Sequence, residues 1–261
     1  MKKLTIVKIG GHIVDDQQKL QLVLKQFSSI KGLKLLVHGG GKKASQISLQ
    51  MGVIPKMVEG RRITDAESLK ITQMVYAGLI NTNIVAKLQS LKCNAFGMNG
   101  ADGNSILAIK RPIKKIDYGY VGDVTKVNAN NINQLLAIGI VPVFCALTHD
   151  AHGQILNTNA DTITAELGIG LSQVFEINLV YCFEKKGVLK NLNDDNSIIS
   201  HISKETYLNL KSEKIIADGM IPKIDNALDA LNRGVQNVFI IKYDELQEFK
   251  KEEKPGTRIS L

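Results

Sequence analysis

The chain has 261 residues, of which 44% are hydrophobic, 22% charged and 5% aromatic, and its formal net charge is +8. A globular protein of this size can bury one large core or two smaller ones. No apolar run approaches the roughly 20 residues that a membrane-spanning helix needs, and the basic residues are scattered, so neither a membrane protein nor a nucleic-acid-binding protein is expected.

Apolar, β-rich runs alternate along the chain with segments of helical pattern. The strand-like runs are residues 4–9, 33–39, 139–147, 175–183 and 237–242. The helical patterns cover residues 18–27 and begin at Lys42, Asp65, Asn159 and Ile221. Such alternation is typical of βαβ units around a mostly parallel sheet. The turn-rich segment 104–128 departs from it and predicts hairpins laid over that sheet.

The stretch "GIGLS" at residues 168–172 interrupts two periodic segments, and a boundary between two parts of the chain is expected there. Cys93, Cys145 and Cys182 lie far apart in apolar stretches, which predicts buried, reduced thiols. The first strand-like run begins at Leu4 and leaves no room for a targeting peptide, so a cytoplasmic location is expected.

Glycines follow two of the predicted strands directly. The first junction, "VKIGGH", contains Lys8, Gly10 and Gly11, and the second, "VHGGGK", contains Gly39–Gly41. In an open parallel sheet, ligands bind outside the carboxyl ends of the strands, so both clusters are expected at the same edge. Backbone N–H groups of glycine can approach an anion closely, and the following helix adds its N-terminal dipole. The two junctions therefore predict a cradle for oxyanions.

Polar side chains at three further places point to the same kind of ligand. Asn157, Asn159 and Asp161 stand at alternate positions before a helix; helix capping explains one of them, and the trio is expected to face a common cleft. Lys223 lies at the start of a helix, where the dipole disfavours a cation unless an anion is near. Arg61 and Arg62 precede another helix, and an arginine can grip a carboxylate with two hydrogen bonds.

These stretches, in this order, resemble the amino acid kinase family, and within it the members that phosphorylate an N-acylated glutamate. The resemblance covers nearly the whole chain and is carried by "KIGGH", "VHGGG", "RRIT", "NTNAD", "GMIPKIDNAL" and "GTRI", with "GADGN" and "YGYVGDV" in the middle. It implies an α/β fold, a three-layer sandwich around a mostly parallel open sheet. It also implies an acyl-glutamate-binding and dimerisation lobe in residues 1–170 and an ATP-binding lobe in residues 171–261.

The resemblance implies phosphoryl transfer from ATP, with Mg²⁺ carried by the nucleotide, to the side-chain carboxylate of an N-acyl-glutamate. Lys8 and Lys223 would flank the phosphoryl group, Asp161 would orient both lysines, and Gly11 would bind its oxygens. Gly40, Gly41, Arg62, Asn157 and Asn159 would serve the substrate. The implied nucleotide-binding residues are Gly10, Glu184, Lys186, Gly187, Val188, Leu189, Ile215, Ile216 and Ala217.

Two departures from the family bear on these expectations. Glu184 and Phe183 stand where the family usually has Asp and Thr or Ser, so the nucleotide site is the least secure part of the resemblance. Arg61 replaces a usual leucine, which keeps N-succinylglutamate open beside N-acetylglutamate, although alternation along an extended segment favours a solvent-facing Arg61.

The two lysines favour a phosphotransferase over the other functions that this fold permits. Another amino acid kinase, or a non-catalytic sensor of acyl-amino acids or nucleotides, would share the fold, but a pure binder has no need of two lysines at one phosphoryl position. Family members that arginine inhibits resemble one another in an extra N-terminal helix that links dimers into hexamers. No helix precedes the first predicted strand here, so an arginine-insensitive homodimer is expected.

Overall fold

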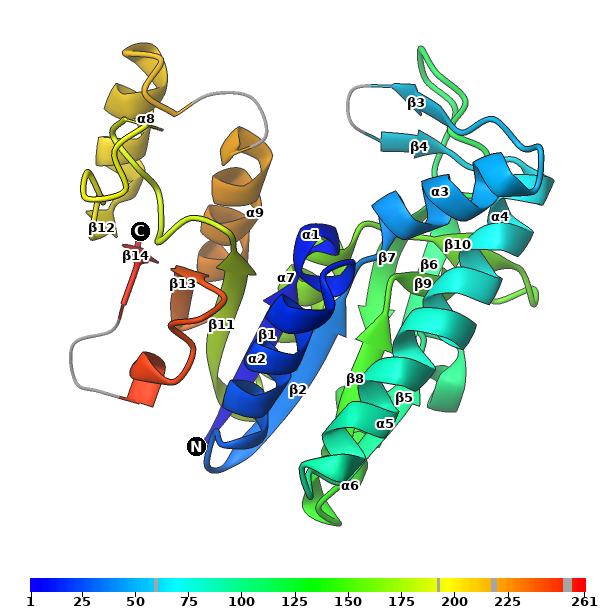
Figure 1. The fold of residues 1–261 in the computed structure, drawn as a ribbon, viewed down its shortest axis with the longest axis horizontal. Coiled ribbons are helices and arrows are strands. Elements are labelled where there is room, and N and C mark those ends of the chain that lie inside the picture. Colours follow the sequence, from blue (N-terminus) through cyan, green and yellow to red (C-terminus); the bar gives the residue numbers. More distant parts are fainter. Residues whose placement is uncertain (59–60, 192, 217–219, 251–254) are drawn as a thin grey trace.

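The computed structural model describes residues 1–58, 61–191, 193–216, 220–250 and 255–261, and its centre is an eight-stranded sheet (Figure 1). Across the sheet the strands follow the order β12 (His201–Ile202), β14 (Thr257–Ile259), β13 (Asn237–Lys242), β11 (Phe175–Phe183), β1 (Lys2–Ile9), β2 (Leu33–His38), β8 (Val141–Cys145) and β5 (Ala95–Met98).

The sheet is mostly parallel, as predicted. All neighbouring pairs from β5 to β13 run parallel, and only the β13–β14 pair of this sheet is antiparallel within the described residues. The central strands are near-continuous apolar runs because both of their faces are covered. In β1, for example, Leu4, Ile6, Val7 and Ile9 are completely buried. The core therefore extends along both faces of β1 and its neighbours.

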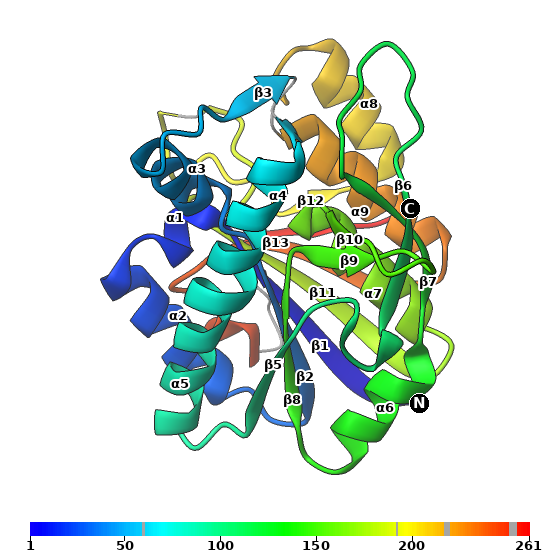
Figure 2. The same cartoon turned by 90° about the vertical axis from the view of Figure 1, so that its right-hand side faces the viewer.

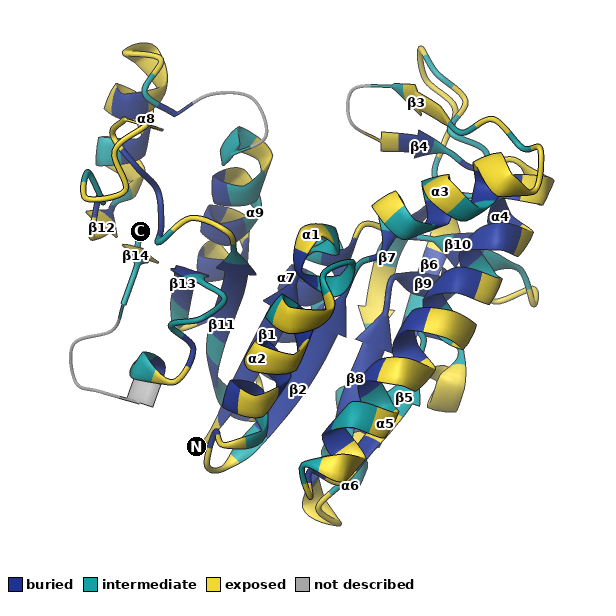
Figure 3. Cartoon of the chain, in the orientation of Figure 1, coloured by how far each residue is buried: buried dark blue, intermediate teal, exposed yellow. Residues whose placement is uncertain are grey.

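Helices cover both faces of the sheet, which confirms the three-layer sandwich. Figure 2 shows α2 (Gln17–Ser28) and α5 (Thr82–Ser90) on one side and α6 (Ala129–Ala137), α7 (Ala160–Leu171) and α9 (Ile221–Asn232) on the other. Their inward sides are buried and their outward sides exposed (Figure 3). Further helices are α1 (Gly11–Val14), α3 (Gly41–Gln50), α8 (Lys204–Ser212), η2 (Asp102–Asn104) and η4 (Glu248–Lys250).

The long helix predicted from Asp65 is present and contains a widened turn. The Asp65 side chain accepts a hydrogen bond from the Ser68 N–H and caps α4 (Ala66–Gln73). The chain continues through the π-helix η1 (Met74–Asn81) directly into α5. Such π-segments are frequently found at functional sites. Here η1 ends at Asn81, whose side chain reaches a strand end beside the glycine loops.

The hairpin predicted in residues 104–128 forms two strands of a second, four-stranded sheet. Its strands follow the order β10 (Ile155–Asn157), β9 (Leu147–His149), β6 (Ile106–Lys110) and β7 (Gly122–Val127). The pairs β6–β7 and β9–β10 are antiparallel. A separate antiparallel pair joins β3 (Lys56–Val58) and β4 (Arg61–Ile63) and lies beyond α3 and α4 (Figure 1). The hairpin prediction for residues 104–128 is thus confirmed.

The stretch 168–172 contains the last turn of α7, which ends at Leu171 before β11 begins at Phe175. A Cβ atom on Gly168 would lie 2.8 Å from the Leu179 side chain, and one on Gly170 would lie 2.6 Å from that of Val127. The two glycines therefore permit close packing of the helix rather than ending it. The division into lobes 1–170 and 171–261 stays a prediction, and the central sheet is continuous across it through the β1–β11 pair.

Two expectations from composition can be compared with the fold. In the part of the chain that the structure describes, no helix is both long enough and apolar enough to cross a membrane. The cysteines Cys93, Cys145 and Cys182 are all buried and free, as predicted.

Candidate active site

A cavity of about 430 Å³ lies where β1 and β2 end. Residues from widely separated parts of the chain line it, and most of the predicted catalytic and substrate-binding residues are among them. These are Lys8, Gly11, Gly40, Gly41, Arg62, Asn157, Asn159 and Asp161. The carboxyl ends of neighbouring parallel strands open on one edge, so residues far apart in sequence meet there.

Lys8, Asp161 and Lys223 form the charged centre of this region. Lys8 lies near the end of β1, and its Nζ is 2.7 Å from Oδ1 of Asp161 in the first turn of α7. The two side chains are only 8% and 14% exposed. Lys223, in the first turn of α9, interacts electrostatically with both of them. The structure thus brings together the two lysines and the aspartate predicted to act on one group.

Burial and charge act in opposite directions on these groups. Burial acts to raise the pKa of Asp161, but the nearby charges of Lys8 and Lys223 outweigh it, so the pKa lies below its ordinary value. Burial lowers the pKa of Lys223; Asp161 opposes this and Lys8 adds to it. Asp161 is therefore ionised at neutral pH, and it compensates two positive charges that would otherwise repel each other.

The two glycine loops differ in why they need glycine. A Cβ atom on Gly40 would lie 2.3 Å from the Ile80 side chain and 3.1 Å from the Tyr76 ring, so the protein itself leaves no room. A Cβ on Gly11 would meet no atom within 4 Å. Packing within the chain therefore does not explain Gly11, and the space beside it is open to a ligand. Gly40 also precedes α3 without a side-chain cap, which leaves N–H groups of the first turn for an anion.

His38 holds the second glycine loop in place. Its Nδ1 lies 2.8 Å from the Gly39 carbonyl oxygen, which can only accept, so Nδ1 carries the proton. Its Nε2 then accepts from the Asn81 amide at 3.0 Å. Burial lowers the pKa of His38 to about 4, so the ring is neutral at pH 7. In a trans peptide the Gly39 C=O and the Gly40 N–H point in opposite directions, so His38 orients that N–H as well.

Three arginines approach the cavity. The Nη2 of Arg62, on β4, donates to the Gly41 carbonyl at 2.9 Å and to the Ser45 hydroxyl at 2.6 Å. Arg61 is exposed yet also lines the cavity, and Arg111 lines it from the second sheet, paired with Asp123 at 2.6 Å. Arg111 was not predicted from the sequence, because nothing in segment 104–128 indicates which part of the cleft its hairpin covers.

The polar trio divides as the spacing suggested. Asn159 is the helix cap: its side chain accepts from the N–H groups of Asp161 and Thr162 at 2.7 and 3.2 Å. Asn157 lies on β10, and its amide donates to the Thr64 hydroxyl at 3.0 Å. All three members of the trio line the cavity, so capping by Asn159 also orients the first turn of α7, where Asp161 stands.

Of the predicted nucleotide-binding residues, those that the structure describes do not line this cavity. Glu184 forms an ion pair with Lys19 at 2.7 Å, and the side chains of Val188, Leu189 and Ile216 are buried in the core. Gly187 packs against Thr257. Gly10, Lys186 and Ile215 are half-buried, and Ala217 lies outside the described residues. Their assignment to a nucleotide stays a prediction, and contacts from the buried members would come from their backbone.

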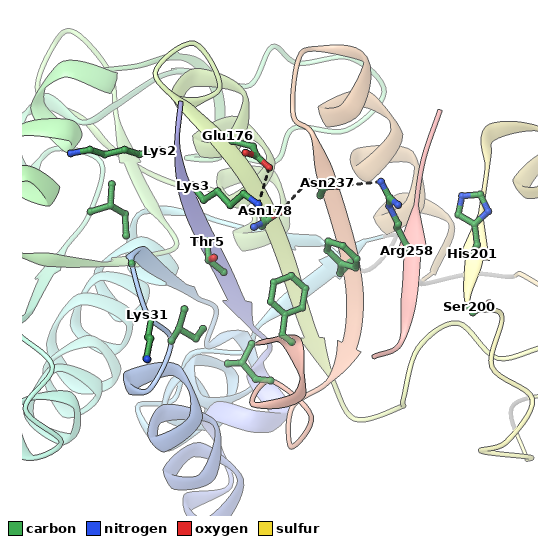
Figure 4. Close-up of a pocket in the computed structure, with 16 residues that line it drawn as sticks. Lys2, Lys3, Thr5, Lys31, Glu176, Asn178, Ser200, His201, Asn237 and Arg258 are labelled. Carbon is green, nitrogen blue, oxygen red and sulfur yellow. Dashed lines mark hydrogen bonds and ion pairs between the residues drawn. The ribbon is translucent and has the colours of Figure 1, made fainter. Parts of the chain in front are cut away.

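A second, larger cavity of about 1280 Å³ lies near the amino ends of the strands (Figure 4). It is lined by polar side chains of the sheet, including an ion pair of 3.6 Å between Lys3 and Glu176 and hydrogen bonds that link Arg258, Asn237 and Asn178. None of the predicted site residues lines it, so the smaller cavity beside the glycine loops is the candidate active site.

Replacement of Asp161 by asparagine is expected to lower the free energy of unfolding by about 3 kcal/mol at pH 7, because it leaves Lys8 buried without its partner. The lowered pKa of Asp161 stabilises the native state above the pKa of the unfolded chain, and this contribution is lost as the pH falls through the folded pKa. The difference between wild type and Asp161→Asn in urea unfolding should therefore shrink below about pH 4. A difference that is the same at pH 7 and pH 3 would contradict the pairing.

The lowered pKa of His38 predicts a second pH dependence of the free energy of unfolding. The pKa of His38 is about 4 in the native state and 6.5 for the free side chain. Between these two values the unfolded state binds a proton at His38 and the native state does not. Wild type should lose about 3 kcal/mol of stability relative to His38→Asn between pH 6.5 and pH 4. Denaturant unfolding of both proteins across that range measures it. Parallel stability curves for the two would show that His38 is protonated normally.

Comparisons with known proteins agree with this fold. The amino acid kinase family model matches residues 3–242. The chain is 54% identical over 261 residues to an acetylglutamate kinase of Cytophaga hutchinsonii, covering 99% of each protein, and 49% identical over 258 residues to one of Bacteroides thetaiotaomicron, covering 99% and 98%. The crystal structure of smu.665 from Streptococcus mutans superposes with a TM-score of 0.80 at 25% identity, covering 100% and 99%. The chain therefore belongs to the amino acid kinase family.

Proposed function

We propose that this protein transfers the γ-phosphoryl group of ATP to the side-chain carboxylate of N-acetyl-L-glutamate. This reaction is a step in arginine biosynthesis through acetylated intermediates. The observation that carries the proposal is the convergence of Lys8 and Lys223 on Asp161 beside two glycine loops. The relatives named acetylglutamate kinase, about half identical over nearly the whole chain, support the choice of substrate.

The chemistry requires charge stabilisation more than proton transfer. A glutamate carboxylate is ionised at pH 7 and is already a nucleophile, so no general base is needed. One of its oxygens attacks the γ-phosphorus, the bond from that phosphorus to the β–γ bridging oxygen breaks, and ADP leaves with the electron pair. Lys8, Lys223 and the N–H groups of Gly11, Gly40 and Gly41 would stabilise the negative charge that spreads over the transferred oxygens.

ATP would bring its own metal ion. No group of three metal-binding side chains occurs among the described residues, and Asp161, the acidic side chain that lines the cavity, is engaged by Lys8. These residues fit Mg²⁺ that is held by the phosphates rather than by a protein cage. The ion would neutralise phosphate charge during transfer.

The nucleotide would extend toward Gly10, Glu184 and the backbone of residues 186–189 and 215–217. Because ATP is made and used in the cytoplasm, we assign the reaction to that compartment.

The acyl-amino acid would bind on the opposite side, between the glycine loop and the β3–β4 hairpin. Arg62 is held by Gly41 and Ser45, so its remaining donors are fixed for the α-carboxylate, with Asn157 and Asn159 beside it. A succinylated glutamate is the second candidate substrate. Arg61 and Arg111 add two further cations to the cavity lining, and an extra carboxylate on the acyl group would need such a partner.

We further propose that the protein acts as a homodimer. Met74 and Leu79 on η1 and Phe96 on the edge strand β5 are between 42% and 51% exposed, although they are large apolar side chains. Clustered apolar exposure on one side of a protein is typical of an interface between subunits. Light scattering that returns the mass of one chain would contradict this.

A coupled assay of ADP release tests the function, and Lys8→Ala and Lys223→Ala test the residues. Each variant is expected to lower kcat about 100-fold or more while raising KM much less, because the two charges act mainly on the transition state. Lys3→Ala, which changes an exposed lysine far from the cleft, is the matched control. Turnover at the wild-type rate in either cleft variant would contradict the assignment, as would ADP release that does not depend on an acyl-glutamate.

The same assay with the two acylated substrates decides the acyl group. We expect kcat/KM for N-acetylglutamate to exceed that for N-succinylglutamate, and Arg61→Leu to change the ratio little. A preference of ten-fold or more for the succinylated substrate, about 1.4 kcal/mol in transition-state binding, would overturn this choice. Loss of that preference in Arg61→Leu would identify the cation that recognises the second carboxylate.

A further inference from the structure

One aromatic ring contacts both lysines of the charged centre. Phe183 is the last residue of β11, and its ring is half-buried at the edge of the sheet that carries the site. The Nζ of Lys8 lies 5.3 Å from the ring centroid, and the Nζ of Lys223 lies at the same distance, 5.3 Å. Lys8 comes from β1 and Lys223 from α9, so this ring links lysines from two separate elements.

The geometry is that of a double cation–π contact. The face of an aromatic ring carries negative charge and attracts an ammonium within about 6 Å of the centroid. Two lysines in one cleft repel each other, and Lys8 lowers the pKa of Lys223. Asp161 supplies one negative charge for the two. The Phe183 ring adds a second attraction that both ammonium groups share.

The ring is itself held in position. Tyr181 precedes it on the same side of β11, and the two rings are stacked with centroids 6.5 Å apart and planes 5° apart. Tyr181 and its neighbour in the strand, Cys182, are both neutral at pH 7 because burial raises their pKa values, that of Cys182 to about 12. Among the described residues, Lys8 and Lys223 are the charged groups that contact the ring, and Asp161 pairs with Lys8.

A ring does something here that a hydroxyl would not. The amino acid kinase family, which this chain resembles, usually has Thr or Ser at this position. A hydroxyl forms a directional hydrogen bond and so occupies one donor of an ammonium group. A ring face attracts the ammonium without accepting a directional hydrogen bond from it, so the contact does not fix how the N–H bonds turn.

We propose that Phe183 is a positioning residue for phosphoryl transfer, whose ring holds the ammonium groups of Lys8 and Lys223 together beside Asp161. The proposal rests on the proposed function for the step that the lysines serve. It requires only the placement of the ring and of the two nitrogens, and it assigns Phe183 no contact with substrate.

Phe183→Leu removes the ring face at similar volume, and Phe183→Tyr keeps it. We expect Phe183→Leu to lower kcat roughly 3- to 30-fold, with KM for either substrate changed less than about twofold, and Phe183→Tyr to restore most of the activity. Phe175→Leu, at the other end of β11, is the control for loss of a large side chain from this strand. Wild-type kcat in Phe183→Leu would overturn the proposal.

The pH profile separates positioning from packing. The ring favours the charged form of Lys223, so its removal should move the alkaline limb of the kcat profile to lower pH in Phe183→Leu and not in Phe175→Leu. An alkaline limb at the same pH in wild type and Phe183→Leu would overturn the proposal. If Phe183→Leu does not fold, Phe183→Met, which also lacks a ring, replaces it in every measurement.

Nuclear magnetic resonance of the enzyme labelled with ¹³C-lysine tests the contact without turnover. The ε-methylene resonances of Lys8 and Lys223, assigned with Lys8→Arg and Lys223→Arg, should show ring-current shifts that Phe183→Tyr keeps and Phe183→Leu loses. Absence of these shifts in wild type would overturn the proposal. An enzyme that shows the shifts but phosphorylates no acyl-glutamate would refute the proposed function alone, while the joint placement of the lysines would stand.

Discussion

The rest of the site depends on the ion pair between Lys8 and Asp161. Lys8 Nζ and Asp161 Oδ1 are 2.7 Å apart, and both side chains are largely buried. A buried charge without a partner is strongly unfavourable, so each of the two groups requires the other. Lys223 adds a second positive charge to the same place, and its own pKa is lowered by burial. One carboxylate therefore keeps two cations close together, with a net positive charge directed at an anionic ligand.

That arrangement can exist only because the fold brings three elements to one edge. Lys8 comes from the end of β1, Asp161 from the first turn of α7 and Lys223 from the first turn of α9. Both helices begin where neighbouring strands of the parallel sheet end, so their N-terminal turns face the glycine loops. The dipoles of the two helices disfavour the lysines but favour Asp161 and any phosphate placed between them.

Less visible contacts hold the parts of the site that bind through the backbone. His38 is buried, neutral and fixed between the Gly39 carbonyl and Asn81. Asn81 ends the π-helical segment η1, so an irregular turn far along the chain supports the loop that follows β2. Packing of Ile80 and Tyr76 against Gly40 acts in the same way. A backbone cradle is only as precise as the side chains that support it, and here those side chains come from the long helix.

Local patterns in the sequence were enough to predict five strands of the central sheet, the capped helices and the glycine junctions, because apolar periodicity and backbone conformation depend on neighbouring residues. The mostly parallel sheet and the shared edge of the two glycine loops followed from the order of those elements. The sequence did not indicate that Gly168 and Gly170 permit close packing of the last turn of α7, because that packing depends on side chains of other elements. Only the tertiary structure decided that Phe183 meets both lysines, that Arg111 reaches the cleft and that Glu184 pairs with Lys19. These contacts join residues from separate elements, and their distances depend on how helices and strands pack, which no local pattern records.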